Sequence, residues 1–424
     1  MTTTWDTVVI GGGLAGLIGA IEVAQGGRKV LLLEKSSRLG GRAMTNKKHG
    51  VHLNLGGHAL YKAGEAYRIL RELGIHIEGG APSSRVKALW HHELMPMPAT
   101  PASMLTSKLL TWSGKWGLMR LMIKLSSSDI NKQGVVTVRE WAEREIADPM
   151  VRHIFYALCR TATYSHDTDH LLAGPALVQV KRSLKGVLYP HGGWQTIVDQ
   201  LREKAAKVGV HIRGNASVKE IVHEHGNVQG VRLADNELIQ ARSVLSTASP
   251  SEIHQMVRGA ERTQLQQWRE EARPSKAACL DIGLRKLPVK DRDIMLALDQ
   301  PIFFSHHTLN AKLSDDGTLV VHLIKYNGPG ESDPKADEDI LTAIMRTLHP
   351  GWEKEVVTKQ FLPNMTVVHD TLHKGRSNLQ TGPSVEGILG LYVAGDWVSH
   401  GEMLADASAA SARRAAVAIL TKKQ

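Results

Sequence analysis

The stretch from Thr7 to Arg42 constrains what this chain can fold into more than any other part of it. An apolar run at residues 7–10 leads into the glycines of residues 11–16, and a second apolar run further on ends at Glu34. An apolar strand, the pattern G-x-G-x-x-G, a helix and a second strand closed by an acid are the parts of a dinucleotide-binding βαβ unit. Glycines alone would indicate only turns, but in this order they predict a dinucleotide site.

The glycine pattern has a physical reason at each position. Gly11 permits the tight turn out of the strand, Gly13 lets the backbone approach a pyrophosphate, and Gly16 lets the helix pack closely on the sheet. Leu14 and Ala15 begin the helix, whose free N–H groups and positive dipole end are expected to face the phosphates. The loop is therefore predicted to hold a pyrophosphate.

The acid that closes the second apolar run is the next candidate. Glu34 stands about twenty residues beyond the glycines, where an acid can accept hydrogen bonds from the two ribose hydroxyls of an adenosine. Lys35 follows it and is predicted to lie at the same site.

Length and cysteine content bound the class of protein. A chain of 424 residues is expected to form two or more domains. Cys159 and Cys279 are too few for a disulfide framework and are most simply buried apolar residues, so a reducing, cytoplasmic compartment is expected. The first strand begins too early for a signal peptide, and no apolar run reaches the ~18–20 residues of a transmembrane helix.

The formal charge of +10 comes without a nucleic-acid motif, and an anionic membrane surface is its most economical explanation. Residues 98–128 interleave Trp, Met and Leu with Lys and Arg and contain no acid. This composition resembles an interfacial membrane helix pair, and a lid or core helix pair of a second domain is the alternative. We expect no nucleic-acid partner and a peripheral contact with the inner face of a membrane.

Periodicity predicts the remaining elements. Thr137 and Glu140 have capping-box spacing at the start of one helix. Helices are expected at 65–73, 137–145, 195–207, 252–258, 261–271, 337–348 and 403–420, with 148–184 mostly helical. Strands are expected at 51–58, 210–212, 216–223, 227–233, 241–248, 277–284, 302–306 and 318–325.

Three further motifs resemble a known family. They are R-L-G-G-R at residues 38–42, Y-P-H-G-G at residues 189–193, and a late strand and acid at residues 391–396. With the βαβ unit they are similar to the flavin-dependent amine oxidase, protoporphyrinogen oxidase and phytoene desaturase superfamily. The resemblance implies an α/β fold, in which a Rossmann-like FAD-binding domain of the glutathione-reductase type carries an interleaved α+β substrate domain. The implied FAD-binding segments are 1–85, 188–250 and 370–424, and the implied substrate segments are 86–187 and 251–369.

The resemblance also implies roles for residues after the βαβ unit. Gly41 and Arg42 would lie along the pyrophosphate and flavin, with Arg42 paired to phosphate charge. Gly56, Gly57 and His58 would pass close to the isoalloxazine, where residues without side chains allow close approach.

The later segments would complete the FAD site. Val218 would read the adenine edge through its backbone, and Asp396, after Gly395, would bind a ribityl hydroxyl. The helix beginning near Leu404 and Ala405 would point its N-terminus at the flavin N1–C2=O edge, which stabilises the anionic reduced flavin.

Two departures narrow the activity. Amine oxidases of this superfamily place a lysine near flavin N5, and we match that position to Leu280 of the strand at 277–284, where there is none. The chain also carries a single G-x-G-x-x-G, whereas flavoenzymes with a dedicated NAD(P)H domain would usually carry another. An oxidase or desaturase is therefore favoured over a two-dinucleotide reductase, and an apolar substrate over an amine.

We expect an FAD-dependent oxidoreductase that dehydrogenates an apolar or amphipathic molecule by hydride transfer to flavin N5. The alternatives are an amine or amino-acid oxidase, and a non-catalytic lipid-binding escort protein like the GDP-dissociation inhibitors. The acceptor is left open among oxygen, a quinone and another carrier. The 21 histidines include no H-E-x-x-H, so no metal is expected, and the pattern nominates no catalytic acid or base.

Overall fold

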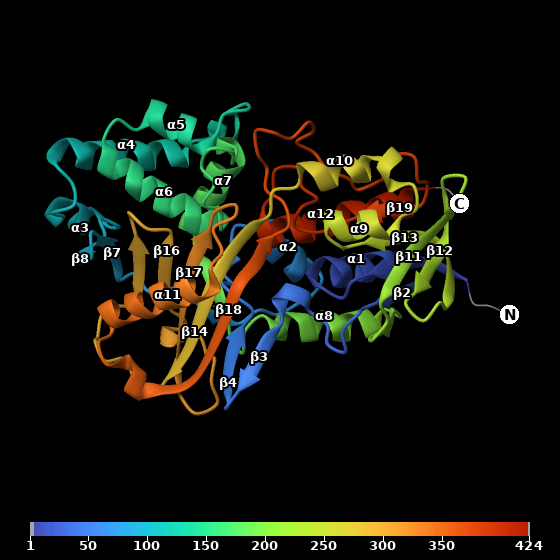
Figure 1. The fold of residues 1–424 in the computed structure, drawn as a ribbon, viewed down its shortest axis with the longest axis horizontal. Helices are drawn as coiled ribbons and strands as arrows, with labels where there is room; N and C mark the ends of the chain where they lie inside the picture. The colour runs from blue at the N-terminus through green and yellow to red at the C-terminus, as the bar shows by residue number, and fades with distance from the viewer. Residues whose placement is uncertain (1–3, 423–424) are drawn as a thin grey trace.

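Two seven-stranded sheets organise the chain, which a computed structural model describes over residues 4–422. The sheets lie toward opposite ends of an elongated molecule, and both termini lie beside the first sheet (Figure 1). The first sheet has the order β10-β2-β1-β13-β12-β11, with β19 paired to β13. Its strands are β1 (Trp5–Ile10), β2 (Val30–Leu33), β10 (His211–Arg213), β11 (Val218–Glu224), β12 (Asn227–Leu233), β13 (Leu238–Ser246) and β19 (Leu391–Val393).

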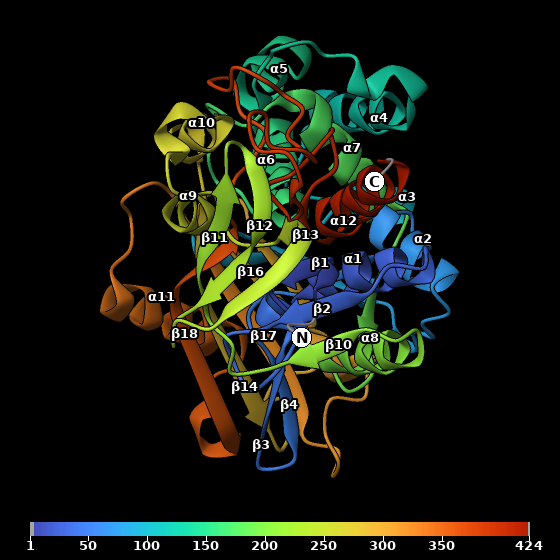
Figure 2. The same ribbon diagram turned by 90° about the vertical axis from the view of Figure 1, so that its right-hand side faces the viewer.

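The central part of this sheet is parallel and covered on both faces. Strands β10, β2, β1, β13 and β19 run parallel, and β12 and β11 continue the sheet antiparallel. Val8 and Val9 are both fully buried, because each face of a parallel sheet packs on helices. One face packs on α1 (Leu14–Gln25), α2 (Glu65–Glu72), α8 (Gln195–Lys207) and α12 (Leu404–Thr421), and the other on α9 (Pro250–Met256) and α10 (Gln264–Glu271). Figure 2 shows α1 and α8 beside β1 and β2.

The second sheet is antiparallel except where β15 pairs with β7, and its order is β18-β14-β17-β16-β15-β7-β8. Its strands are β7 (Val86–Trp90), β8 (Glu93–Pro96), β14 (Ser275–Leu284), β15 (Ile294–Ala297), β16 (Ile302–His306), β17 (Leu319–Asn327) and β18 (Val356–Val368). Helix α11 (Pro334–Leu348) covers one face. The other face turns toward the first sheet and borders the cavity described below.

A helical layer closes the end away from the termini (Figure 1). It consists of α3 (Pro101–Thr106), α4 (Trp112–Ser126), α5 (Val138–Glu145), α6 (Pro149–Thr163) and α7 (Ala173–Leu184). These helices share a core around the fully buried Trp141 and Phe155. The hairpin β3 (Thr45–Lys48) and β4 (Val51–Asn54) and the small sheet β5 (Leu60–Tyr61), β9 (Val187–Pro190) and β6 (Gly79–Gly80) link the two halves.

The predicted α/β fold is confirmed, and so are most of its elements. The helix predicted at 195–207 is α8, and at α5 both hydrogen bonds of the Thr137–Glu140 capping box are present. Cys159 and Cys279 are free and buried, as expected. The strand predicted at 51–58 was too long, because β4 ends at Asn54 and a turn follows.

Eight strands and one packing relationship differ from the sequence-based expectation. The strands that were not predicted are β3, β5, β6, β7, β8, β9, β15 and β18. Helices α9 and α10 fall in the segment 251–369 that was assigned to the substrate part, yet they pack on the first sheet. The two-domain division itself stays a prediction.

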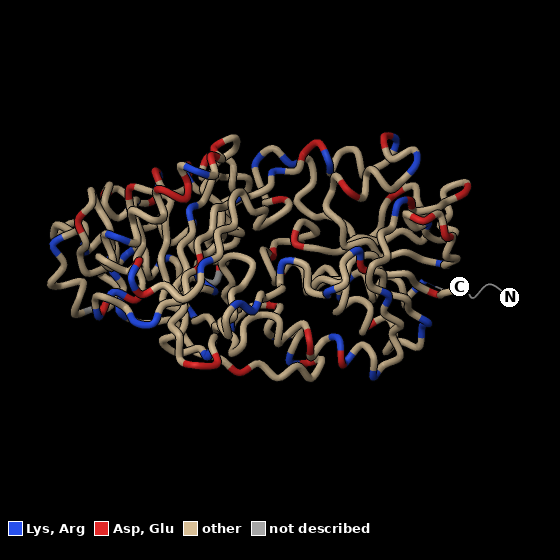
Figure 3. The backbone as a smooth tube through the Cα atoms, turned by 60° about the horizontal axis from the view of Figure 1, so that its bottom comes forward, with Lys and Arg blue, Asp and Glu red and all other residues tan. Residues whose placement is uncertain are grey.

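Charge and helix length bear on the possible environments of the chain. Basic residues lie along the whole molecule, interspersed with acidic ones (Figure 3). Within residues 4–422, no helix is long and apolar enough to cross a bilayer. The same residues include no group of three or more His, Cys, Asp or Glu arranged to hold a metal ion.

Candidate functional site

A cavity of about 770 Å³ runs from the glycine loop of the first sheet to the inner face of the second. All of the site residues predicted from the sequence line it except Gly16 and Gly56, which lie directly behind its wall. Those that line it are Gly11, Gly13, Leu14, Ala15, Glu34, Lys35, Gly41, Arg42, Gly57, His58, Val218, Gly395, Asp396, Leu404 and Ala405. Segments far apart in the sequence thus meet around one space.

The glycine loop is shaped by close approaches of its backbone. Gly11 has a φ of +100°, and a Cβ there would lie 2.4 Å from the hydroxyl of Thr247, which donates to the Ile10 carbonyl at 2.8 Å. A Cβ on Gly16 would lie 1.8 Å from the carbonyl oxygen of Gly11, so only glycine fits. Helix α1 begins after Gly13 with no side-chain cap and no acid in its first turn. Gly13, Leu14 and Ala15 line the cavity, so the first N–H groups of the helix, which have no side-chain cap among the described residues, can bind an anion there.

Glu34 is held by the backbone on either side of it. Its carboxylate accepts a hydrogen bond from the Gly12 N–H at 2.7 Å and another from the Ser36 N–H at 2.8 Å. A carboxylate has about four acceptor positions, so capacity remains for hydroxyls in the cavity. Val218 lies at the start of β11 beside this point, and the Ala216 N–H donates to the Glu34 carbonyl at 2.9 Å.

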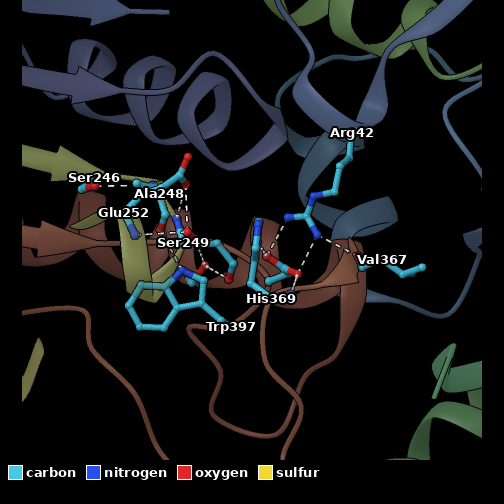
Figure 4. Close-up of polar contacts among 11 residues, drawn as sticks. Arg42, Ser246, Ala248, Ser249, Glu252, Val367, His369 and Trp397 are labelled. Atoms are coloured by element: carbon cyan, nitrogen blue, oxygen red, sulfur yellow. Dashed lines mark hydrogen bonds and ion pairs between the residues drawn. The ribbon is translucent and has the colours of Figure 1, made fainter. Parts of the chain in front are cut away.

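Lys35 lies at the rim of the cavity and pairs with a residue that the sequence did not indicate. Its ammonium lies 3.1 Å from the carboxylate of Glu252 in α9. Glu252 also forms a capping box with Ser249 (Figure 4). Burial by itself would raise the pKa of Glu252, but hydrogen bonds from Ser249 and the charge of Lys35 lower this pKa to about 2. Glu252 is therefore ionised at neutral pH.

Arg42 and Asp396 form a bidentate ion pair at the cavity wall. The two guanidinium nitrogens donate to the two carboxylate oxygens of Asp396 at 2.8 and 2.7 Å, and one also donates to the Val367 carbonyl at 2.7 Å. The His369 N–H donates to the same carboxylate at 2.8 Å, and Arg42, Val367 and His369 converge there in Figure 4. Burial would raise the pKa of Asp396, but the charge of Arg42 and these hydrogen bonds hold it far below its ordinary value.

The resemblance implied separate roles for Arg42 and Asp396. Arg42 was expected at a phosphate and Asp396 at a ribityl hydroxyl, and the structure joins them to each other. Both still line the cavity, so the roles stay predictions. His369 was missed, because nothing in the sequence places it beside a residue so far along the chain.

Helix α12 presents a second uncapped N-terminus to the cavity. Its first residues, Leu404 and Ala405, and then Ser408 line the wall, and Met403 before them makes no side-chain cap. Gly395 is fixed by the Ser411 hydroxyl of the same helix, which accepts from its N–H at 3.0 Å and donates to its carbonyl at 3.1 Å.

The far end of the cavity is mainly apolar. Gly56 has a φ of +93°, and a Cβ there would lie 2.1 Å from the terminal methyl of Met365. Tyr164 lines this end, and its ring meets that of Tyr326 edge-on with centroids 6.1 Å apart. His58 also lines it, and burial lowers the pKa of its imidazole. The apolar cluster behind this wall consists of Ala277, Cys279, Ile324 and Tyr326, packed against Phe303, Leu362 and Met365.

The register of β14 corrects one expectation. Leu280 belongs to the cluster under α11, so it points away from the cavity. Ala277 and Cys279 lie on the face that borders the cavity, and Asp281 shares their side by alternation. Leu280, the position that we matched to this lysine, therefore does not face the cavity. None of the three residues on the face that borders the cavity is a lysine.

The fold and this cavity define a flavoprotein of the dinucleotide-binding type. The sequence matches the family described as flavin containing amine oxidoreductase over residues 14–280, and the chain belongs to that family. The cofactor is thus a flavin, and the glycine loop, two uncapped helix N-termini and Glu34 fit FAD.

The chain is similar to carotenoid enzymes in sequence and to several oxidoreductases in structure. It is 23% identical to the phytoene desaturase of Neurospora crassa, over 81% of this chain and 65% of that protein. It is 22% identical to the 15-cis-phytoene desaturase of Solanum lycopersicum, over 94% of this chain and 74% of that protein. The chain thus spans less than two thirds of the Neurospora enzyme.

Among solved structures, an oxidoreductase from Methanosarcina mazei superimposes with a TM-score of 0.80 at 18% identity, covering 96% of this chain and 99% of that one. The cyclohexylamine oxidase from Brevibacterium oxydans does so with a TM-score of 0.68 at 16% identity, covering 99% of each chain. At these identities the likeness shows the fold alone.

Proposed function

We propose that the protein dehydrogenates an apolar or amphipathic molecule by hydride transfer to bound FAD. The observation that carries this proposal is that one cavity joins a dinucleotide cradle to an apolar wall. Glycine backbone, helix dipoles and Glu34 lie at one end, and Tyr164, Met365 and the cluster around Cys279 lie at the other.

The residues that would hold FAD follow from the geometry. The loop at Gly11 and Gly13 and the N-terminus of α1 would take the pyrophosphate, and Glu34 and Val218 the adenosine. The N-terminus of α12 would stabilise negative charge on the flavin. When bound, the flavin supplies the acceptor for a hydride at N5. The protein's part is to orient an apolar substrate against the wall at Tyr164 and exclude water.

An amine or amino-acid oxidase is the first alternative, since the fold is shared with amine oxidases. The face of β14 that borders the cavity carries no lysine, and the Tyr164–Tyr326 rings meet edge-on rather than forming a parallel pair. Both observations favour an apolar substrate. Peroxide release in an amine panel would support the alternative instead.

A non-catalytic lipid-binding escort is the second alternative. Such a protein has no need for a complete dinucleotide cradle. Titration of the purified protein with FAD, followed by photoreduction and reoxidation in air, separates the two functions. We expect saturable uptake, with flavin absorbance bands that bleach and return. A protein that takes up no FAD would refute the proposed function.

We also propose that helices α3 and α4 form a surface that contacts an anionic bilayer. Trp112, Trp116, Met119 and Ile123 recur at positions i, i+4, i+7 and i+11, so they share one face of α4. Trp112 is 71% exposed and Ile123 68%, whereas Leu118, Leu121 and Leu125 of the opposite face are buried in the helical core. Apolar side chains gathered on one exposed face mark an interaction site.

The basic residues around this surface favour an anionic bilayer as its partner. Lys115 holds its ammonium 4.7 Å from the centre of the Trp112 ring, and neither Lys108 nor Arg120 makes an ion pair within the described chain. Lys124 is the exception, since it pairs with Glu145 of α5. Tryptophan and exposed basic residues without acids suit the boundary between anionic headgroups and acyl chains. A substrate drawn from the membrane would match the apolar cavity.

A further inference from the structure

A row of polar side chains crosses the apolar inner face of the second sheet. Gln360 of β18, Asp281 of β14, His322 of β17 and Ser305 of β16 lie directly opposite one another in register. The next row consists of Leu362, Cys279, Ile324 and Phe303, which are apolar. Polar groups on a buried sheet face are costly unless they are paired or used.

Every side chain of the row has a hydrogen-bond partner, but one ring nitrogen is left without one. His322 Nδ1 lies 2.6 Å from one carboxylate oxygen of Asp281, and the Gln360 amide donates to the other at 3.2 Å and to the Asn54 carbonyl at 2.8 Å. The Ser305 hydroxyl lies 3.1 Å from that of Tyr189. His322 Nε2 is buried and has no hydrogen-bond partner within the described residues.

The unpartnered nitrogen faces the wall of the cavity at Gly57. A Cβ on Gly57 would lie 3.0 Å from His322 Nε2 and 3.3 Å from the Tyr164 hydroxyl. The φ of Gly57 is not positive, so its backbone conformation does not require glycine. Glycine is required here because a side chain would crowd the imidazole and the Tyr164 ring. Gly57 and Tyr164 both line the cavity, and His322 Nε2 lies directly behind them.

Asp281 distinguishes His322 from the imidazoles around it. Two other imidazoles lie close by: His58 lines the cavity, and His307 stacks its ring on that of His322 with centroids 5.4 Å apart. Neither has a carboxylate partner within the described residues. Burial lowers the pKa of both imidazoles below its ordinary value, so both are uncharged at neutral pH. A carboxylate bound to Nδ1–H fixes the tautomer and leaves the Nε2 lone pair as a base.

We propose that the Asp281–His322 pair accepts the proton that the substrate loses on dehydrogenation, an inference that rests on the proposed function. Forming a C=C bond breaks two C–H bonds. The hydride, with its electron pair, goes to the oxidised flavin, which is the two-electron oxidant. The proton goes to the Nε2 lone pair of His322, and the Asp281 carboxylate stabilises the resulting imidazolium.

The pH dependence of the midpoint potential of bound FAD tests the pair without a known substrate. If the pair takes the proton that the substrate loses, proton uptake at His322 should be coupled to two-electron reduction of the bound flavin. We expect the slope of potential against pH to lose this one-proton component in H322Q and D281N. S305A, in the same row but not titratable, should keep the wild-type slope. An H322Q slope equal to that of the wild type would overturn the proposal.

Histidine-selective ¹⁵N NMR tests the pair independently of flavin binding. The groups facing His322 are Asp281, His58, His307 and Tyr164, with His306 and Tyr189 beside His307. The His322 signal, identified by its loss in H322Q, should show a protonated Nδ1 and an Nε2 that takes up a proton as the pH is lowered. An Nε2 that is protonated at every pH contradicts the proposal, whereas failure of FAD uptake alone refutes only the proposed function.

Discussion

Arg42 and Asp396 are 354 residues apart in the sequence and meet in a bidentate ion pair at the cavity wall. The pair ties the turn after the βαβ unit to the segment before α12. The Asp396 carboxylate is buried, whereas the Arg42 guanidinium is partly exposed to the cavity, so losing the carboxylate should cost less than the ~3–5 kcal/mol typical of a fully buried pair. The two ends of the cofactor site are therefore coupled through this contact.

Asp396→Asn should weaken that coupling. We expect a loss of stability of about 1–2 kcal/mol in urea unfolding and at least a tenfold weaker affinity for FAD, since Arg42 and His369 lose their common anchor. Fluorescence titration with FAD measures the second effect. Unchanged stability and affinity would show that the contact does not organise the site.

Gly16→Ala should abolish FAD binding while the chain still folds. The added Cβ would lie 1.8 Å from the Gly11 carbonyl oxygen and would displace the glycine loop. Gly117→Ala is the matched control, because its Cβ in α4 would meet its nearest neighbour, Val151, at an ordinary 3.6 Å. Absorbance of bound flavin after gel filtration reports the difference, and equal flavin content in the two variants would argue against the cradle.

The surface of α3 and α4 should carry membrane binding. Wild-type protein is expected to float with anionic liposomes, less so at high salt, because salt screens the basic residues. A Trp112→Ala, Trp116→Ala double variant should remain with the unbound protein. Leu389→Ala removes another exposed apolar side chain, 55% exposed, and should float like wild type. Equal flotation of all three proteins would rule out this surface.

The stability of the fold should depend on the protonation of Asp406, which is buried at the start of α12 and accepts the Ala66 N–H at 2.9 Å. Burial raises the pKa of Asp406 to about 6, against the opposing Ala66 hydrogen bond and the charge of Arg182. The folded state thus holds a proton that the unfolded state releases above about pH 4, so stability falls as pH rises from there through 6. Between pH 4 and 7, the free energy of unfolding measured in urea should fall by about 3 kcal/mol more for the wild type than for Asp406→Asn. Parallel pH profiles for the two proteins would contradict this account.

The sequence could predict what depends on local chemistry. The βαβ unit, helix α8 and the capping box of α5 follow from periodicity and turn residues that are contiguous in the chain. Strand β18 was missed, because Pro363 and Asn364 interrupt its pattern and its pairing with β14 contains register shifts.

Pairings across the fold were beyond a sequence-based prediction. The Arg42–Asp396 contact and the Asp281–His322 pair depend on which strands become neighbours, and no local pattern encodes that choice. The same holds for the face to which Leu280 belongs. A one-residue change of register exchanges the two faces of a strand, so its cavity-facing residues become known only with the sheet.

Anaerobic reduction of the bound flavin by its substrate tests the central claim most directly. The FAD-loaded protein would be mixed with a polyene such as phytoene in anionic vesicles, and separately with a panel of amines, while the flavin absorbance is followed. We predict that the polyene bleaches the flavin and gains a double bond, and that the amines do not bleach it. Bleaching by an amine, with none by the polyene, would contradict the assignment of an apolar substrate.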